Sequence, residues 1–194
     1  MLQKPYNYED AKLIIKEMTD ELSLELVDRG IITNQLVLDI GYDIVSADSA
    51  VSRGNDIKSD RYGRNVPKPA HGSINLKEHT SSGRVIINAM MELYDRIVNK
   101  SYYIRRMSVT ANHVIFETEY KKQEQYKQLD LFSYMEFEEN EKNKKAEEEK
   151  DKDMQKAVLK VKKKYGKNSL VKGMSLLENA TAMDRNKQIG GHKA

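Results

Sequence analysis

The sequence predicts an α+β protein: a small, antiparallel-leaning sheet with two helices on one face, followed by a charged tail that is partly helical or disordered. Apolar residues recur every three or four positions in two long segments and alternate with polar residues in three shorter ones. Charged residues make up 32% of the chain and apolar residues only 39%. This composition favours a compact domain joined to a solvated segment.

Composition divides the chain into four parts. We expect a folded domain at 1–120, a linker at 121–135, a charged linker at 136–153 and a basic tail with short helices at 154–194. The tail carries 10 basic and 2 acidic residues, whereas 136–153 carries 5 and 9. A basic end indicates either a polyanionic partner or simple solvation.

The absence of cysteine excludes a disulfide framework and any cysteine-based metal or nucleophile site. No apolar run approaches the roughly 20 residues that span a bilayer, and the first residues do not form a signal peptide. We therefore expect a soluble, cytoplasmic protein with no membrane partner.

The first helix is expected from Tyr8 to about Asp28, with Asn7 as its N-cap and Gly30 as its stop. The alternating segment from Ile31 to Ile44 then predicts a half-buried strand. Residues 46–72 show no apolar periodicity and contain five basic residues, which predicts a long basic loop.

A second strand is predicted at 73–78, and a second helix begins after Ser82-Gly83 and ends near Lys100. Residues 103–109 predict a third strand, which 114–116 either extends or follows as a separate short strand. Residues 136–153 are typical of a single solvated helix or a disordered linker. Helical spacing returns at 154–165, and the apolar patch beyond Gly166 is too small to fold alone.

Catalytic chemistry is poorly supported. The four histidines are isolated, and neither a phosphate loop nor a nucleophile elbow is present. Asp39 and Asp43 share one face of a strand and could hold Mg²⁺. We prefer a solvent-facing polar stripe, because nothing nearby would complete a metal site.

The outward face of the predicted sheet favours nucleic-acid binding through phosphates, with salt-sensitive and largely sequence-independent affinity. The alternative is scattered surface charge on a near-neutral domain. The Ser/Gly-rich start of the second helix either holds a phosphate on its free N–H groups or is ordinary capping. The outward residues are Asn75, Lys77, His79, Arg106 and Ser108, with Arg105 at the margin.

A pentapeptide follows the predicted domain: Gln128-Leu129-Asp130-Leu131-Phe132. An extended peptide with two adjacent large apolar side chains, Leu131 and Phe132, can fill a preformed pocket while Gln128 satisfies a polar one. The alternative to a docking peptide is that Leu129, Leu131 and Phe132 pack back onto the domain as the end of its last element.

The chain resembles the C-terminal part of a Y-family translesion DNA polymerase, of the UmuC-like (ImpB/MucB/SamB) branch from Gram-positive bacteria. The resemblance covers nearly the whole chain, and the tail is its most specific part. The passages that carry it are Leu2 to Tyr6 with the helix that follows, Tyr102 to Val109, the pentapeptide, and the tail segments 162–174 and 185–194.

The resemblance implies a little-finger domain that grips damaged template–primer duplex. It places Lys77, Arg105, Arg106 and Ser108 on the DNA face, with Thr80, Ser82 and Arg84 as candidates at the helix start. It also implies that Gln128, Leu129, Asp130, Leu131 and Phe132 bind the bacterial sliding clamp.

The family's palm, fingers and thumb have no counterpart in this sequence. We therefore expect no catalysis from the chain as it stands and no cofactor, since Mg²⁺ would belong to the palm. A truncation, a split gene and a fragment all fit this expectation, and a palm fragment or a regulator would be a partner in trans.

The resulting hypothesis is a non-catalytic module of DNA repair, in SOS-type translesion synthesis, that binds damaged DNA and docks on the clamp. The alternative is an accessory protein that binds the clamp or a polymerase regulator, with incidental DNA contacts. Duplex-binding anisotropy at two salt concentrations separates the two.

Overall fold

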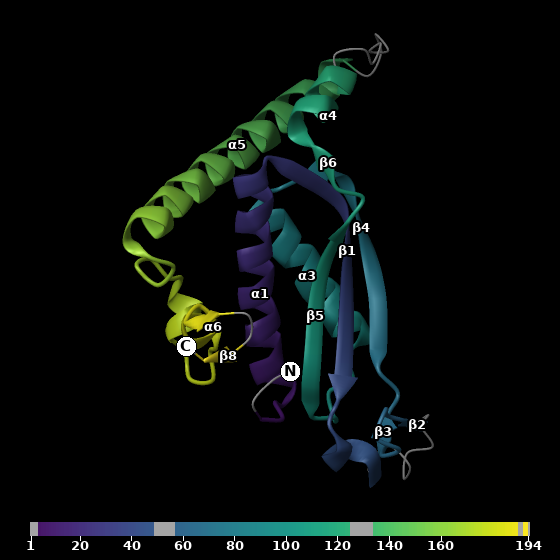
Figure 1. Ribbon diagram of the computed structural model, residues 1–194. Coiled ribbons are helices and arrows are strands. Elements are labelled where there is room, and N and C mark those ends of the chain that lie inside the picture. The colour runs from purple at the N-terminus through teal and green to yellow at the C-terminus, as the bar shows by residue number, and fades with distance from the viewer. Residues whose placement is uncertain (1–3, 49–56, 125–133, 190–191, 194) are drawn as a thin grey trace.

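The computed structural model describes residues 4–48, 57–124, 134–189 and 192–193. Helices α1 (Tyr8–Arg29) and α3 (Gly83–Ile97) pack on one face of an antiparallel sheet (Figure 1). Strand β1 (Ile31–Tyr42) lies in the middle of the sheet, between β4 (Ala70–Thr80) and β5 (Ile104–Asn112). The predicted α+β class, with two helices on one face, is confirmed.

The core lies between β1 and the two helices. Every second residue of β1 points inward, and Leu36, Leu38 and Ile40 are each at most 1% exposed. They belong to one cluster of buried side chains with residues of both helices, among them Ile14 of α1 and Met90 of α3. Burial on one face only leaves the opposite face of the sheet without an apolar layer.

Both helices begin and end where the sequence predicts. The side chain of Asn7 accepts a hydrogen bond from the N–H of Asp10, and the Ser82 side chain accepts one from Val85. Gly30 ends α1 in the left-handed region, at φ 65°, where a residue without Cβ adopts the conformation at no steric cost.

Strand β1 ends at Tyr42, two residues before the predicted end. The carboxylate of Asp43 accepts a hydrogen bond from the N–H of Val45 at 3.1 Å and starts the 3-10 turn η1 (Ile44–Ser46). Ile44 is therefore outside the strand and exposed, so its inclusion in the predicted half-buried strand is wrong.

The prediction of an irregular loop at 46–72 is also wrong in part. Strands β2 (Ile57–Ser59) and β3 (Asn65–Pro67) form a hairpin, and β4 begins at Ala70 rather than Ser73. One carboxylate oxygen of Asp60 accepts the N–H groups of Tyr62 and Arg64, at 2.8 and 3.0 Å. Hydrogen bonds from Arg64 lower the pKa of Asp60 below its ordinary value. Strands of three residues are too short to show alternation in a sequence.

The chain beyond β5 is more regular than predicted. Strand β6 (Ile115–Phe116) is separate and pairs with the start of β1, and α4 (Glu117–Glu124) follows it. Helix α5 (Tyr134–Tyr165) joins the two predicted segments 136–153 and 154–165 into one helix. The remaining elements are η2 (Gly173–Leu176), α6 (Ala182–Arg185), β7 (Gln188–Ile189) and β8 (His192–Lys193).

Gly72 of β4 faces α3 at a close approach. A Cβ at this position would lie 3.0 Å from Cγ2 of Ile97 and 3.2 Å from Cδ1 of Leu93. We predict that Gly72→Val destabilises the protein by about 1–3 kcal/mol, because its side chain pushes α3 away from the sheet.

Urea unfolding measures this change. Ser73→Val introduces the same side chain on the exposed face of the same strand and should shift stability by less than about 0.5 kcal/mol. Equal losses in the two variants would contradict the close packing of α3 on β4.

Candidate nucleic-acid interface

The face of the sheet opposite α1 and α3, hereafter the open face, is polar along all three long strands. Strand alternation and register define it. Its outward residues are His71, Ser73, Asn75 and Lys77 on β4, Gln35, Val37 and Asp39 on β1, and Arg106, Ser108, Thr110 and Asn112 on β5.

Three amide side chains form a ladder across the open face. Gln35 stands opposite both Asn75 and Asn112. Its Nε2 donates to Oδ1 of Asn75 at 2.9 Å, and its Oε1 accepts from Nδ2 of Asn112 at 3.1 Å. The ladder holds three uncharged side chains in place and leaves part of their hydrogen-bonding capacity for a ligand.

Asp39 is an acidic group near the centre of the open face. It stands opposite His71 on β4 and Ser108 on β5, and its Oδ1 lies 2.6 Å from Nδ1 of His71. The imidazole of His71 is thus within hydrogen-bond distance of this carboxylate.

The structure does not join Asp39 and Asp43 into a metal site. Asp43 is buried, caps η1 and lies 3.8 Å from Nε of Arg105. Among the residues that the structure describes, no group of three or more His, Cys, Asp or Glu side chains could hold a metal ion.

A β-bulge in β5 turns two arginines away from the core. Tyr42 pairs with Ile104 and Gly41 pairs with Arg106, so Arg105 is an extra residue in β5. Without this bulge, strict alternation would direct Arg105 inward. Arg106 is exposed on the open face, whereas Arg105 is half-buried beside Asp43 at its margin.

Gly41 leaves room for the Arg106 side chain. A Cβ at position 41 would lie 3.2 Å from Cβ of Arg106, which is a tight contact between neighbouring strands. A larger residue at 41 would therefore displace the arginine.

The predicted site residues fall into two places. Lys77, Arg106 and Ser108 are exposed on the open face, with Arg105 at its edge. The other three, Thr80, Ser82 and Arg84, lie at the start of α3, where Thr80 and Ser82 are buried. His79, predicted on the outward face, instead packs beside α4: the centroid of its ring lies 5.3 Å from that of Tyr120.

A carboxylate of α5 occupies the start of α3. Oδ2 of Asp151 accepts from Oγ of Ser82 at 2.6 Å and from the N–H of Arg84 at 3.4 Å. The guanidinium of Arg84 donates to Glu147 at 2.7 Å, and this contact raises the pKa of Arg84 above its ordinary value. The negative charge at this positive helix end is thus internal, and the structure does not bring these residues together with the open face.

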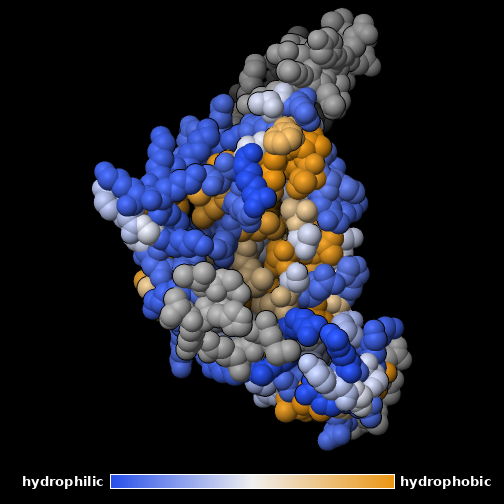
Figure 2. All heavy atoms as spheres, viewed as in Figure 1, coloured by the Kyte–Doolittle hydropathy of each residue, from blue (hydrophilic) through white to orange (hydrophobic). Residues whose placement is uncertain are grey.

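Gln155 anchors α5 beside that contact. Its Nε2 donates to Oγ of Ser23 at 3.2 Å and to the carbonyl oxygen of Ser81 at 3.3 Å. Of the α5 side chains that the structure describes, only Gln155 is buried. The visible surface over α5 is mostly hydrophilic (Figure 2), as expected of a helix that touches the domain on one side.

The amide ladder and the arginine bulge were not predicted as functional features. Gln35 is recognisable in the sequence as an outward residue of a strand. Its neighbours across the sheet are known only once the register is known. The predicted clamp peptide, Gln128 to Phe132, lies outside the described residues.

A comparison with protein families gives a match over residues 2–131 to the impB/mucB/samB family C-terminal domain. The chain belongs to this family. The match runs from the start of the domain through α4 and into the pentapeptide. It identifies the chain as a C-terminal part of a Y-family polymerase.

A search of curated proteins finds no match to the chain. The family match ends before α5 and the segments that follow it. None of the described helices is long and apolar enough to cross a membrane.

We predict that Asp151→Asn destabilises the impB/mucB/samB domain by about 1 kcal/mol, because it weakens the capping of α3. Thermal unfolding of the full chain measures the loss. Asp153→Asn is the control, since its exposed carboxylate pairs only with Lys156 of the same helix among the contacts described. Equal melting temperatures for both variants would mean that α5 does not cap α3.

Proposed function

We propose that the domain grips duplex DNA through the open face and connects it to the bacterial sliding clamp through the peptide at 128–132. In this proposal the chain is the damaged-DNA-binding and clamp-docking part of a translesion polymerase. The observation that carries it is the polar open face, with cations near its two ends, in a chain of the impB/mucB/samB family.

The arrangement of charge suits contacts to the DNA backbone. Arg106 stands opposite Gly41, and Lys77 lies beyond the Asn75–Gln35 pair. Six residues of β1 separate Gly41 from Gln35, and Lys77 lies two residues past Asn75, so the two cations are about 26 Å apart along the strands at about 3.3 Å per residue. This distance corresponds to about eight base pairs of duplex. Cations at both ends contact phosphates, and the neutral ladder lies between them.

The open face is suited to sequence-independent recognition. Gln35, Asn75 and Asn112 are the amide side chains that could read adenine, yet they hydrogen-bond to one another. Base readout by asparagine or glutamine needs both the oxygen and the nitrogen of the amide. Binding through phosphates is therefore the stronger contribution, and it falls as salt concentration rises.

We predict that Lys77→Ala with Arg106→Ala weakens duplex binding about tenfold and lowers the salt slope by about 2, because two phosphate contacts are lost. Fluorescence anisotropy at two salt concentrations measures both quantities. The control is Lys16→Ala with Arg29→Ala, which removes the same charge from exposed positions of α1. The open face is not the DNA interface if both double variants behave alike.

We predict that Leu131→Ala with Phe132→Ala abolishes binding to the sliding clamp and leaves duplex binding unchanged. Titration of the purified clamp checks this. The control is Leu176→Ala with Leu177→Ala, an adjacent pair that is 69% and 58% exposed. Unchanged clamp affinity in the first variant would falsify the assignment of the peptide.

The accessory-protein alternative predicts a different pair of results. Clamp or regulator binding would remain strong, and duplex affinity would not respond to Lys77 or Arg106. The same two titrations therefore separate a DNA-gripping module from a protein whose DNA contacts are incidental.

A further inference from the structure

The segment that ends the chain lies against α1, in the helical layer of the protein (Figure 1). We call residues 160–188 the strap; it comprises the end of α5, η2 and α6. The strap carries eight basic and two acidic residues. Its contacts join it to residues of α1 that are more than 100 positions away in the sequence.

One buried carboxylate of α1 holds the strap at its far end. Glu17 is only 2% exposed, and its Oε2 accepts the N–H groups of Thr181 and Ala182 at 2.9 and 3.0 Å. A guanidinium nitrogen of Arg185 lies 3.8 Å from the same oxygen. Two backbone donors and one cation thus converge on a single side chain.

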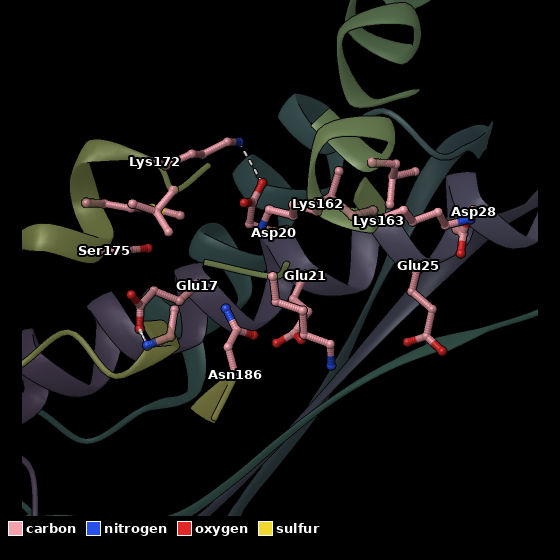
Figure 3. A pocket seen from close by; sticks show the side chains of 16 residues that line it. Glu17, Asp20, Glu21, Glu25, Asp28, Lys162, Lys163, Lys172, Ser175 and Asn186 are labelled. Atoms are coloured by element: carbon pink, nitrogen blue, oxygen red, sulfur yellow. Dashed lines mark hydrogen bonds and ion pairs between the residues drawn. The ribbon is translucent and has the colours of Figure 1, made fainter. Parts of the chain in front are cut away.

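Two further ion pairs fasten the strap along α1 (Figure 3). Nζ of Lys172 lies 2.6 Å from a carboxylate oxygen of Asp20. Lys163 pairs with Asp28, which lies eight residues further along α1. Asn179 adds a hydrogen bond from its Nδ2 to Asp10 at 3.3 Å. The strap therefore follows a line of acidic residues along one helix.

Polar contacts rather than apolar burial keep the strap in place. None of residues 160–188 is buried, and a cavity of about 540 Å³ lies between the strap, α5 and α1. Exposed ion pairs contribute little stability and are screened by salt.

The contact between buried Glu17 and half-buried Arg185 is also incompletely satisfied. Oε1 of Glu17 and all three guanidinium nitrogens of Arg185 find no hydrogen-bond partner among the described residues. Such a pair does not recover its full desolvation cost. A segment held in this way belongs to the low-stability end of a structure and opens without global unfolding.

We propose that the strap is a second DNA-binding element held in reserve, whose cations bind either the carboxylates of α1 or the phosphates of duplex DNA. This inference rests on the proposed function, because it adds a regulated contact to the DNA-binding face. In the docked state, α1 neutralises Lys163, Lys172 and Arg185. In the released state these cations join the phosphate contacts of the open face.

The test begins with docking, which needs no DNA. Glu17→Ala with Asp20→Ala removes two acceptors of the strap. The matched control, Glu92→Ala with Glu119→Ala, removes the same charge from exposed helix positions away from the strap. Hydrogen exchange at the amides of Thr181 and Ala182 should be at least tenfold faster in the first variant than in the parent and control. High salt should accelerate this exchange in the parent chain. If the amides of Thr181 and Ala182 already exchange without protection in the parent chain, the strap is not docked on α1 in solution.

Duplex binding of the same full-length variants then tests the reserve role. With about three additional phosphate contacts, the released variant should bind about tenfold more tightly at low salt, with a salt slope steeper by about 3 than in the control. Fast exchange together with unchanged affinity and slope would overturn the reserve role. If the parent and the control do not bind duplex at all, both the proposed function and the reserve role are wrong. The exchange measurement still decides whether the strap docks on α1.

Discussion

The one-sided burial of β1 is the constraint on which the rest of the structure depends. Leu36, Leu38 and Ile40 face the two helices and are nearly inaccessible, while Gln35 and Asp39 face the other way. A shift of one residue in register would exchange the two sets. The same alternation that builds the core therefore produces the polar open face, and no separate element is needed to present it.

Charge is distributed very differently in the two layers. In the helical layer, acidic and basic groups far apart in sequence are paired, as Arg84 is with Glu147 and Lys172 with Asp20. On the open face, Lys77 is exposed near the amide ladder, and Arg106 is exposed toward the other end of the strands, beyond Asp39. A polyanion therefore meets exposed cations on the sheet, while Lys163, Lys172 and Arg185 of the helical layer are engaged by carboxylates of the same chain.

The family match and the geometry describe complementary parts of the molecule. The impB/mucB/samB match covers the sheet, α1 and α3, and it assigns the chain to a part of a Y-family polymerase. The strap lies beyond the match, yet it contacts α1 within it. The proposed regulation thus couples a segment outside the family domain to a helix that forms the core of that domain.

Local periodicity determined the two helices, the N-cap at Asn7, the inward side of β1 and the α+β class. These features depend on residues within a few positions of one another, which a sequence displays directly. The bulge at Arg105, the ladder across Gln35 and the engagement of Ser82 by Asp151 depend on strand register and on pairs up to 77 residues apart. Only the tertiary structure decided these three features. The sequence offers many chemically equivalent partners for each residue, and packing selects one of them.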